Sequence, residues 1–98
     1  MEYNKLPDLN GLATLRAVVE RGGVEAAARV LHIGQPAVTK RLRALEASYG
    51  TALMERKGRR LVLTPAGERV YDFARLVLER QQSLLDDLAA LELSLIHI

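Results

Sequence analysis

Residues 24–50, VEAAARVLHIGQPAVTKRLRALEASYG, decide the fold of this chain. The stretch begins with an alanine-rich segment that predicts a short helix, whose small side chains let another helix approach closely. Residues 32–34 interrupt the helical pattern. A longer helix then starts at Gln35 and stops at Gly50, with Pro36 in its first turn, where the missing N–H of proline is tolerated. A short helix, a tight turn containing glycine and a longer helix predict a helix-turn-helix motif.

The longer helix has two chemically different faces. At about 100° per residue, four apolar side chains share one side, which must be buried: Val38, Leu42, Leu45 and Tyr49. An amide, a hydroxyl and two cations surround a proline on the other side: Gln35, Pro36, Thr39, Lys40 and Arg43. Such groups can hydrogen-bond base edges and phosphates in a DNA major groove. On periodicity alone, an ordinary solvated helix face explains the pattern equally well.

The formal charge of the chain, +2, hides an asymmetry along the sequence. Residues 16–60 contain ten basic and four acidic side chains, whereas residues 61–98 contain three basic and six acidic ones. A basic block beside an acidic one suggests a polyanionic partner for the first block only. Charge alone leaves a solvated, mixed surface as an equal alternative.

A basic hairpin follows the longer helix. Residues 52–56 and 61–63 predict two short strands. The tip between them, KGRR at 57–60, adds three cations to Arg56. Edge strands carry lysine to avoid aggregation, but four cations at one tip exceed that need. A basic hairpin beside a polar helix face is the geometry of a wing, which can insert an arginine such as Arg59 into a minor groove.

The last predicted helix begins at Thr64 and Pro65, a favourable cap and first helical residue, and runs to about Leu91. Apolar residues recur along it at heptad-like spacing, interrupted by Gln81. A helix of about 40 Å is too long for so small a domain to cover, and no further helix remains to form an intramolecular hairpin. We therefore predict a dimerisation seam along this helix: Val70, Ala74, Val77, Leu84, Leu88 and Leu91.

The sequence contains no arrangement that indicates catalysis or a cofactor. The chain has no cysteine, its two histidines lie far apart, and no glycine-rich phosphate loop follows a strand. We expect no enzyme activity, no catalytic residue, no metal and no cofactor. We expect Glu46, next to Leu45, to make a structural ion pair. No apolar run approaches the roughly 20 residues that span a membrane, so we expect no membrane partner.

Three segments resemble the N-terminal DNA-binding domain of LysR-type transcriptional regulators. Residues 25–46, EAAARVLHIGQPAVTKRLRALE, resemble the family's helix-turn-helix. LMER at 53–56 and LTPAG at 63–67 resemble its wing and the start of its linker helix. The order and spacing match without gaps from about residue 9 to residue 91. The resemblance implies a mainly α fold: a winged helix-turn-helix with a two-stranded β-hairpin wing and a long C-terminal linker and dimerisation helix.

The resemblance also implies a function and a set of contacts. The implied protein is a cytoplasmic, nucleoid-associated homodimer that binds partly palindromic promoter sites in double-stranded DNA. Minor-groove contact falls on Arg59, with Arg56 nearby, and helix geometry makes Arg43 a phosphate contact. Glu25 stands where the family commonly has threonine, which puts one phosphate contact in doubt. Major-groove contacts fall on four residues: Gln35, Pro36, Thr39 and Lys40.

We divide the chain into a DNA-binding domain (8–65), a linker and dimerisation helix (65–92) and a non-native tail (93–98). The tail, LSLIHI, reads like a translated sequencing adapter; a genuine apolar helix end is the alternative. If it is an adapter, the family's effector domain is missing, and a small-molecule effector would act only through that domain. The competing function is a winged-helix protein-interaction or dimerisation module without DNA binding, which would expose apolar residues on the longer helix.

Overall fold

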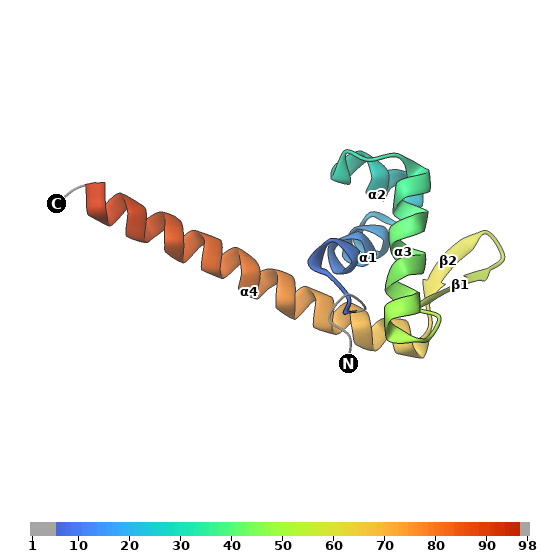
Figure 1. The fold of residues 1–98 in the computed structure, drawn as a ribbon. Helices are drawn as coiled ribbons and strands as arrows, with labels where there is room; N and C mark the ends of the chain where they lie inside the picture. Colours follow the sequence, from blue (N-terminus) through green and yellow to red (C-terminus); the bar gives the residue numbers. More distant parts are fainter. Residues whose placement is uncertain (1–5, 97–98) are drawn as a thin grey trace.

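The computed structural model describes residues 6–96, and its side chains through residue 94 (Figure 1). In that range three helices and a hairpin form a head, from which a long helix extends (Figure 1). This arrangement confirms the predicted mainly α, winged helix-turn-helix fold. The elements follow in the order α1 (Leu9–Arg21), α2 (Val24–Leu31), α3 (Gln35–Tyr49), β1 (Met54–Lys57), β2 (Arg60–Leu63) and α4 (Pro65–Ile96).

Cap residues mark both ends of α1. The Asp8 carboxylate caps α1 by accepting a hydrogen bond from the Gly11 N–H at 2.8 Å. Helix α1 ends at Gly22 with a left-handed φ of 85°, a conformation that glycine adopts without a steric penalty. The α2–α3 turn instead uses His32, a non-glycine residue with φ of 57°, to end α2.

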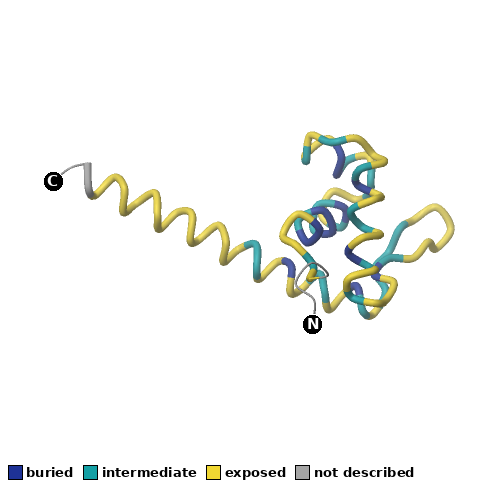
Figure 2. Tube along the Cα trace, viewed as in Figure 1, coloured by how far each residue is buried: buried dark blue, intermediate teal, exposed yellow. Residues whose placement is uncertain are grey.

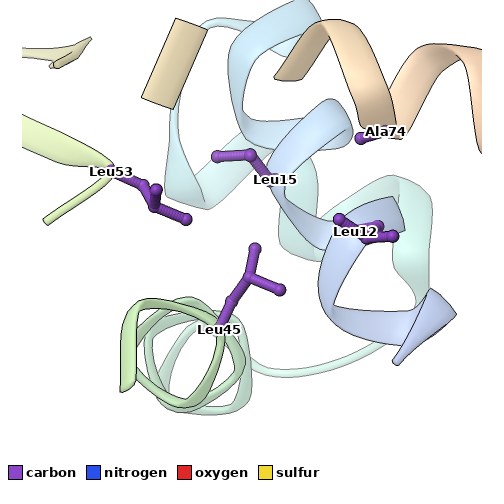
Figure 3. Close-up of a cluster of buried hydrophobic side chains, with 5 residues drawn as sticks. All are labelled: Leu12, Leu15, Leu45, Leu53 and Ala74. Atoms are coloured by element: carbon purple, nitrogen blue, oxygen red, sulfur yellow. The ribbon is translucent and has the colours of Figure 1, made fainter. Parts of the chain in front are cut away.

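The main core joins α1, α3, the hairpin and α4. Its buried members come from α1, α3, α4 and the residue that precedes β1 (Figure 3): Leu12, Leu15, Leu45, Leu53 and Ala74. A second cluster packs α2 against α1 and α3 and contains Val18, Ala27, Ala28 and Val38. The two small alanines of α2 are buried in this cluster, as close helix approach requires. Together the clusters hold α3 with one face against α1.

The hairpin differs slightly from the predicted one. Strands β1 and β2 pair antiparallel, with Lys57 opposite Arg60. The turn therefore contains only two residues, Gly58 and Arg59, rather than the four expected. Gly58 has φ of 65°, which lets the chain reverse tightly and extends the strand pairing by one residue pair.

Helix α4 begins directly against the base of the hairpin. The Thr64 hydroxyl accepts a hydrogen bond from the Gly67 N–H at 2.9 Å, which confirms the predicted N-cap. The same hydroxyl donates to the Ala52 carbonyl at 2.7 Å. A Cβ on Gly67 would lie 1.9 Å from the Leu53 carbonyl oxygen, so only glycine permits this close approach of helix and strand.

The later course of α4 departs from the prediction in length. The helix continues to Ile96, beyond the expected end near Leu91, and so includes the first residues of the predicted tail. Residues 97–98 lie outside the described part. The first half of α4 packs against the head, whereas residues 79–94, hereafter the arm, are exposed throughout (Figure 2).

Candidate nucleic-acid interface

One edge of α3 presents polar groups to solvent. Five side chains, hereafter the reading edge, are all exposed: Gln35, Pro36, Thr39, Lys40 and Arg43. The residues predicted for the opposite face are buried or half-buried, with Val38 and Leu45 fully inside the core. The structure thus orients α3 as its periodicity predicts. Four residues of the edge line one shallow surface hollow, Pro36, Thr39, Lys40 and Arg43.

The reading edge adjoins the hairpin. Thr39 and Arg43 also line a second hollow, whose other wall includes Met54 and Leu61 of the two strands. The hairpin extends beside α3 (Figure 1). The base of the basic hairpin therefore lies beside the reading edge.

Glu46 attaches the hairpin to α3, and the predicted ion pair is wrong. The carboxylate accepts hydrogen bonds from the backbone N–H groups of Leu53, at 2.8 Å, and Met54, at 3.4 Å. Leu53 precedes strand β1 and Met54 begins it. The half-buried Glu46 carboxylate accepts hydrogen bonds from these backbone N–H groups in place of the expected bond to a cation. Glu46 thereby fixes the base of the hairpin relative to the reading edge.

A third hollow of about 590 Å³ separates the hairpin from the α1–α2 turn. Arg56 and Arg59 line it from the hairpin side, and both are exposed. Arg29 of α2 and Arg60 also line it. Arg60 belongs to the predicted basic tip, whereas the sequence gives no sign that Arg29 joins it, because only the approach of α2 to the hairpin brings these distant segments together.

Glu25 lies in the same hollow and reduces its positive charge. Its carboxylate is 3.4 Å from the Arg29 guanidinium, one helical turn away on α2. Both side chains are more than two-thirds exposed, at 73% and 71%, so the pair contributes little to stability. The pairing leaves Arg56, Arg59 and Arg60 as the surplus cations in this hollow.

The predicted dimerisation residues fall into two groups. Ala74 is fully buried by α1 and the rest of the core, and Val70 and Val77 pack against the same cluster. The other three lie on the arm and are at least half exposed: Leu84 at 51%, Leu88 at 52% and Leu91 at 61%. Two exposed apolar residues were missed nearer the head, Phe73 and Leu76. Phe73 lies eleven residues before Leu84, about three helical turns, and this spacing could have revealed it.

Residues 6–96 contain no helix that is both long and apolar enough to cross a membrane. In the same part of the chain, no group of three or more histidine, aspartate or glutamate side chains is arranged to hold a metal ion.

A family model described as bacterial regulatory helix-turn-helix protein, lysR family, matches residues 9–68, which is more than half of the chain. The chain belongs to the lysR family. The HTH-type transcriptional regulator TfdS of Cupriavidus pinatubonensis is 47% identical over 70 residues, which cover 71% of this chain and 24% of TfdS. The chain thus spans about a quarter of the length of the curated relatives it matches.

Solved structures of lysR-family DNA-binding domains share the fold. The CbnR DNA-binding domain, in a complex with DNA, has a TM-score of 0.76 and 38% identity, covering 85% of this chain and 95% of that one. The BenM DNA-binding domain, in a complex with catB site 1 DNA, has a TM-score of 0.81 and 30% identity, covering 86% and 94%. The lysR-family match therefore extends beyond the head into α4.

Proposed function

We propose that this chain is the sequence-reading part of a transcriptional regulator, and that residues 8–65 are its DNA-binding domain. The reading edge enters a major groove, and the hairpin reaches the neighbouring minor groove through Arg59, with Arg56 beside it. One observation carries the proposal: four exposed polar or cationic side chains on α3, grouped around Pro36, adjoin an arginine-bearing hairpin. The DNA complexes of CbnR and BenM, which share the fold, support it.

Within the reading edge, each side chain has a distinct role in the proposal. Gln35, at the start of α3, offers an amide that can pair with adenine, and Lys40 can reach guanine O6 and N7. Thr39 offers a hydroxyl that can hydrogen-bond either base. Arg43, one turn further along and close to the hairpin, contacts a backbone phosphate that fixes the register.

The alternative, a protein-interaction module, predicts an apolar patch where the reading edge lies. The large exposed apolar side chains of the head, Leu6, Leu9 and Val30, belong to other segments. The composition of the edge therefore favours nucleic acid. We further propose that the regulator has no enzyme activity and acts in the cytoplasm, in keeping with the transcriptional regulators that it resembles.

We further propose that residues 65–92 act as a linker through which two copies associate. The exposed leucines of the arm supply the contact, namely Leu84, Leu88 and Leu91, with Phe73 extending the stripe toward the head. A two-fold dimer would present two reading edges to successive major-groove half-sites of a partly palindromic site. The buried Ala74 belongs to the chain's own core and is left out of this contact.

Two further parts of the proposal concern the full-length protein: the site of effector binding and the origin of residues 93–98. A small-molecule effector would bind a domain outside this chain, since the chain covers about a quarter of its relatives. Residues 93–98 are proposed as a non-native tail, although residues 93–96 continue α4. Resequencing the source gene beyond codon 92 tests both assignments.

The test of DNA reading begins with selection of bound duplexes from a random pool, which defines the preferred site. Lys40→Ala and Gln35→Ala are then measured on that site and on scrambled DNA. Each should weaken specific binding by about 1–3 kcal/mol and relax the preference at one base position. Arg59→Ala should weaken binding to both duplexes and lower the salt dependence of affinity by about one unit of slope.

Arg80→Gln provides the matched control, because it removes a cation from the arm, away from the reading edge and the hairpin. It should bind like the parent once sedimentation shows the same oligomeric state. If all three interface variants bind every duplex as the parent does, the assignment of the interface is wrong. If the selection yields no preferred sequence, the interaction-module alternative replaces DNA reading.

A further inference from the structure

One side-chain contact joins the head to α4 outside the apolar core. The Tyr71 hydroxyl donates a hydrogen bond to the Glu20 carboxylate at 2.9 Å, linking the second turn of α4 to the end of α1. The two residues are 51 positions apart in sequence. Among the described side chains, every other side-chain-to-side-chain hydrogen bond joins residues within one helical turn. None of the functions proposed above uses this contact.

A second interaction strengthens the position of the tyrosine ring. The Arg75 guanidinium carbon lies 5.7 Å from the centre of the Tyr71 ring, within the range of a cation–π contact. Partial burial, together with the hydrogen bond and negative charge of Glu20, raises the pKa of Tyr71, and Arg75 opposes that effect. Tyr71 is therefore held by a carboxylate on α1 and a cation on α4.

The contact can restrain the angle between α4 and α1. Ala74 is fully buried in the core with Leu12 and Leu15, which sets how closely α4 approaches α1 (Figure 3). Val70, Val77 and Leu78 of α4 pack on the same core, so apolar contacts on both sides of Ala74 limit rotation of one helix over the other. The Tyr71–Glu20 hydrogen bond adds a directional restraint, because it ties one point of α4 to the end of α1.

The length of α4 amplifies any change of this angle. From Tyr71 to Leu91 the helix rises about 30 Å, so a rotation of about 10° moves the arm leucines by about 5 Å. Base pairs are spaced by about 3.4 Å along DNA. A rotation of this size, allowed by a small loss of restraint at Tyr71, therefore shifts the arm relative to the head by the length of one or two base pairs.

We propose that Tyr71 is a positioning residue whose hydrogen bond to Glu20 sets the angle between the head and the arm, and with it the half-site spacing that the dimer accepts. The part about spacing rests on the proposed dimeric DNA reader. The part about the angle does not, and it is tested separately on the chain alone.

The first experiment measures the angle without DNA. The chain has no cysteine, so Ser48→Cys on α3 and Ala90→Cys on the arm give two unique spin-label positions, both exposed. Labelled protein is mixed with excess unlabelled protein, so that electron–electron distances arise within one chain. Tyr71→Phe should shift or broaden the distance distribution by several ångströms, because it removes only the hydroxyl.

Two further variants separate positioning from general loosening of the fold. Glu20→Gln keeps a hydrogen-bond acceptor and should retain the parent distribution, whereas Glu20→Ala should reproduce the effect of Tyr71→Phe. Tyr49→Phe is the matched control, because it removes the hydroxyl of the other tyrosine packed on the same core and leaves the Glu20 contact in place. A Tyr71→Phe distribution identical to that of the parent overturns the proposal.

The second experiment measures spacing on duplexes that carry two selected half-sites separated by every spacing over one helical turn. The parent should prefer one spacing, and Tyr71→Phe should move or widen that optimum by one or two base pairs while its affinity for a single half-site stays within twofold. An unchanged optimum, despite a changed distance distribution, overturns the spacing part. Absence of DNA binding by the parent would overturn the proposed function but leave the distance result standing.

Discussion

The two halves of α4 have similar apolar content but opposite environments. In residues 65–78 the apolar side chains mostly pack on the head, and Ala74 is completely buried. In the arm, the leucines at comparable spacing are about half exposed (Figure 2). A heptad-like row of apolar residues therefore predicts that a helix face is buried, but it does not identify the segment or chain that buries it. Here the chain's own α1 covers one half, and we propose that a second copy covers the other.

The largest effect is expected where the first half of α4 meets the head. Leu15 of α1 is fully buried in the cluster that includes Leu45 of α3 and Ala74 of α4, so Leu15→Ala leaves a cavity in the main core. We expect a loss of about 2–5 kcal/mol in the free energy of unfolding. Urea denaturation of dilute protein measures it, and a loss below 1 kcal/mol would mean that this core is not the one that holds the head together.

A substitution on the arm should weaken dimerisation and leave the free energy of unfolding almost unchanged. Leu84→Lys places a charge in the proposed contact, and a two-fold dimer contains the change twice. We expect the dimer dissociation constant to rise by about 100-fold, or about 2.7 kcal/mol, because two leucine side chains lose their burial. Sedimentation equilibrium measures this change. The unfolding free energy of the dilute monomer should move by less than about 0.5 kcal/mol.

Phe73 sharpens the boundary between the two halves, because it belongs to the half that packs on the head but is 49% exposed. If it continues the stripe of the arm, Phe73→Ala should weaken dimerisation by about tenfold, roughly one partly buried aromatic face per copy. Its neighbour Asp72, also exposed, supplies the control as Asp72→Ala. Equal dimer affinities of the two variants would place the boundary beyond Phe73.

The smallest effect concerns alkaline pH. The pKa of Tyr71 is raised above its usual value of 10, mainly by burial and then by Glu20. A group whose folded-state pKa is raised stabilises the fold below its unfolded pKa and loses this contribution as the pH climbs through the folded value. The α1–α4 contact should therefore weaken only above pH 10. Phenolate absorbance of the parent minus Tyr71→Phe gives the midpoint, and a midpoint at or below 10 contradicts the assignment.

Most of the head could be predicted from local signals. The burial of Val38 and Leu45 follows from a period of 3.6 residues. Both ends of α1 follow from Asp8 and Gly22, and the start of α4 follows from Thr64. These features depend on neighbours in sequence. The exposure of the reading edge is their direct consequence, because the other side of α3 is occupied by the core.

What could not be predicted depends on contacts between distant segments. Ala74 was assigned to a dimer seam because nothing in its heptad position distinguishes an internal partner from an external one. Glu46 was assigned an ion pair, since the sequence does not show that two strand N–H groups lie within 3.4 Å of it. Arg29 escaped notice because the hairpin that approaches it begins 25 residues later.

The junction at Thr64 has a mechanical consequence. Only this residue separates the end of β2 from the start of α4, and its backbone and hydroxyl are both bonded to the opposite strand connection, at 2.9 and 2.7 Å. Because no flexible segment lies between them, we expect the hairpin and α4 to rotate as one unit. A rotation imposed on the far end of α4 should therefore also move the hairpin tip that we propose contacts the minor groove.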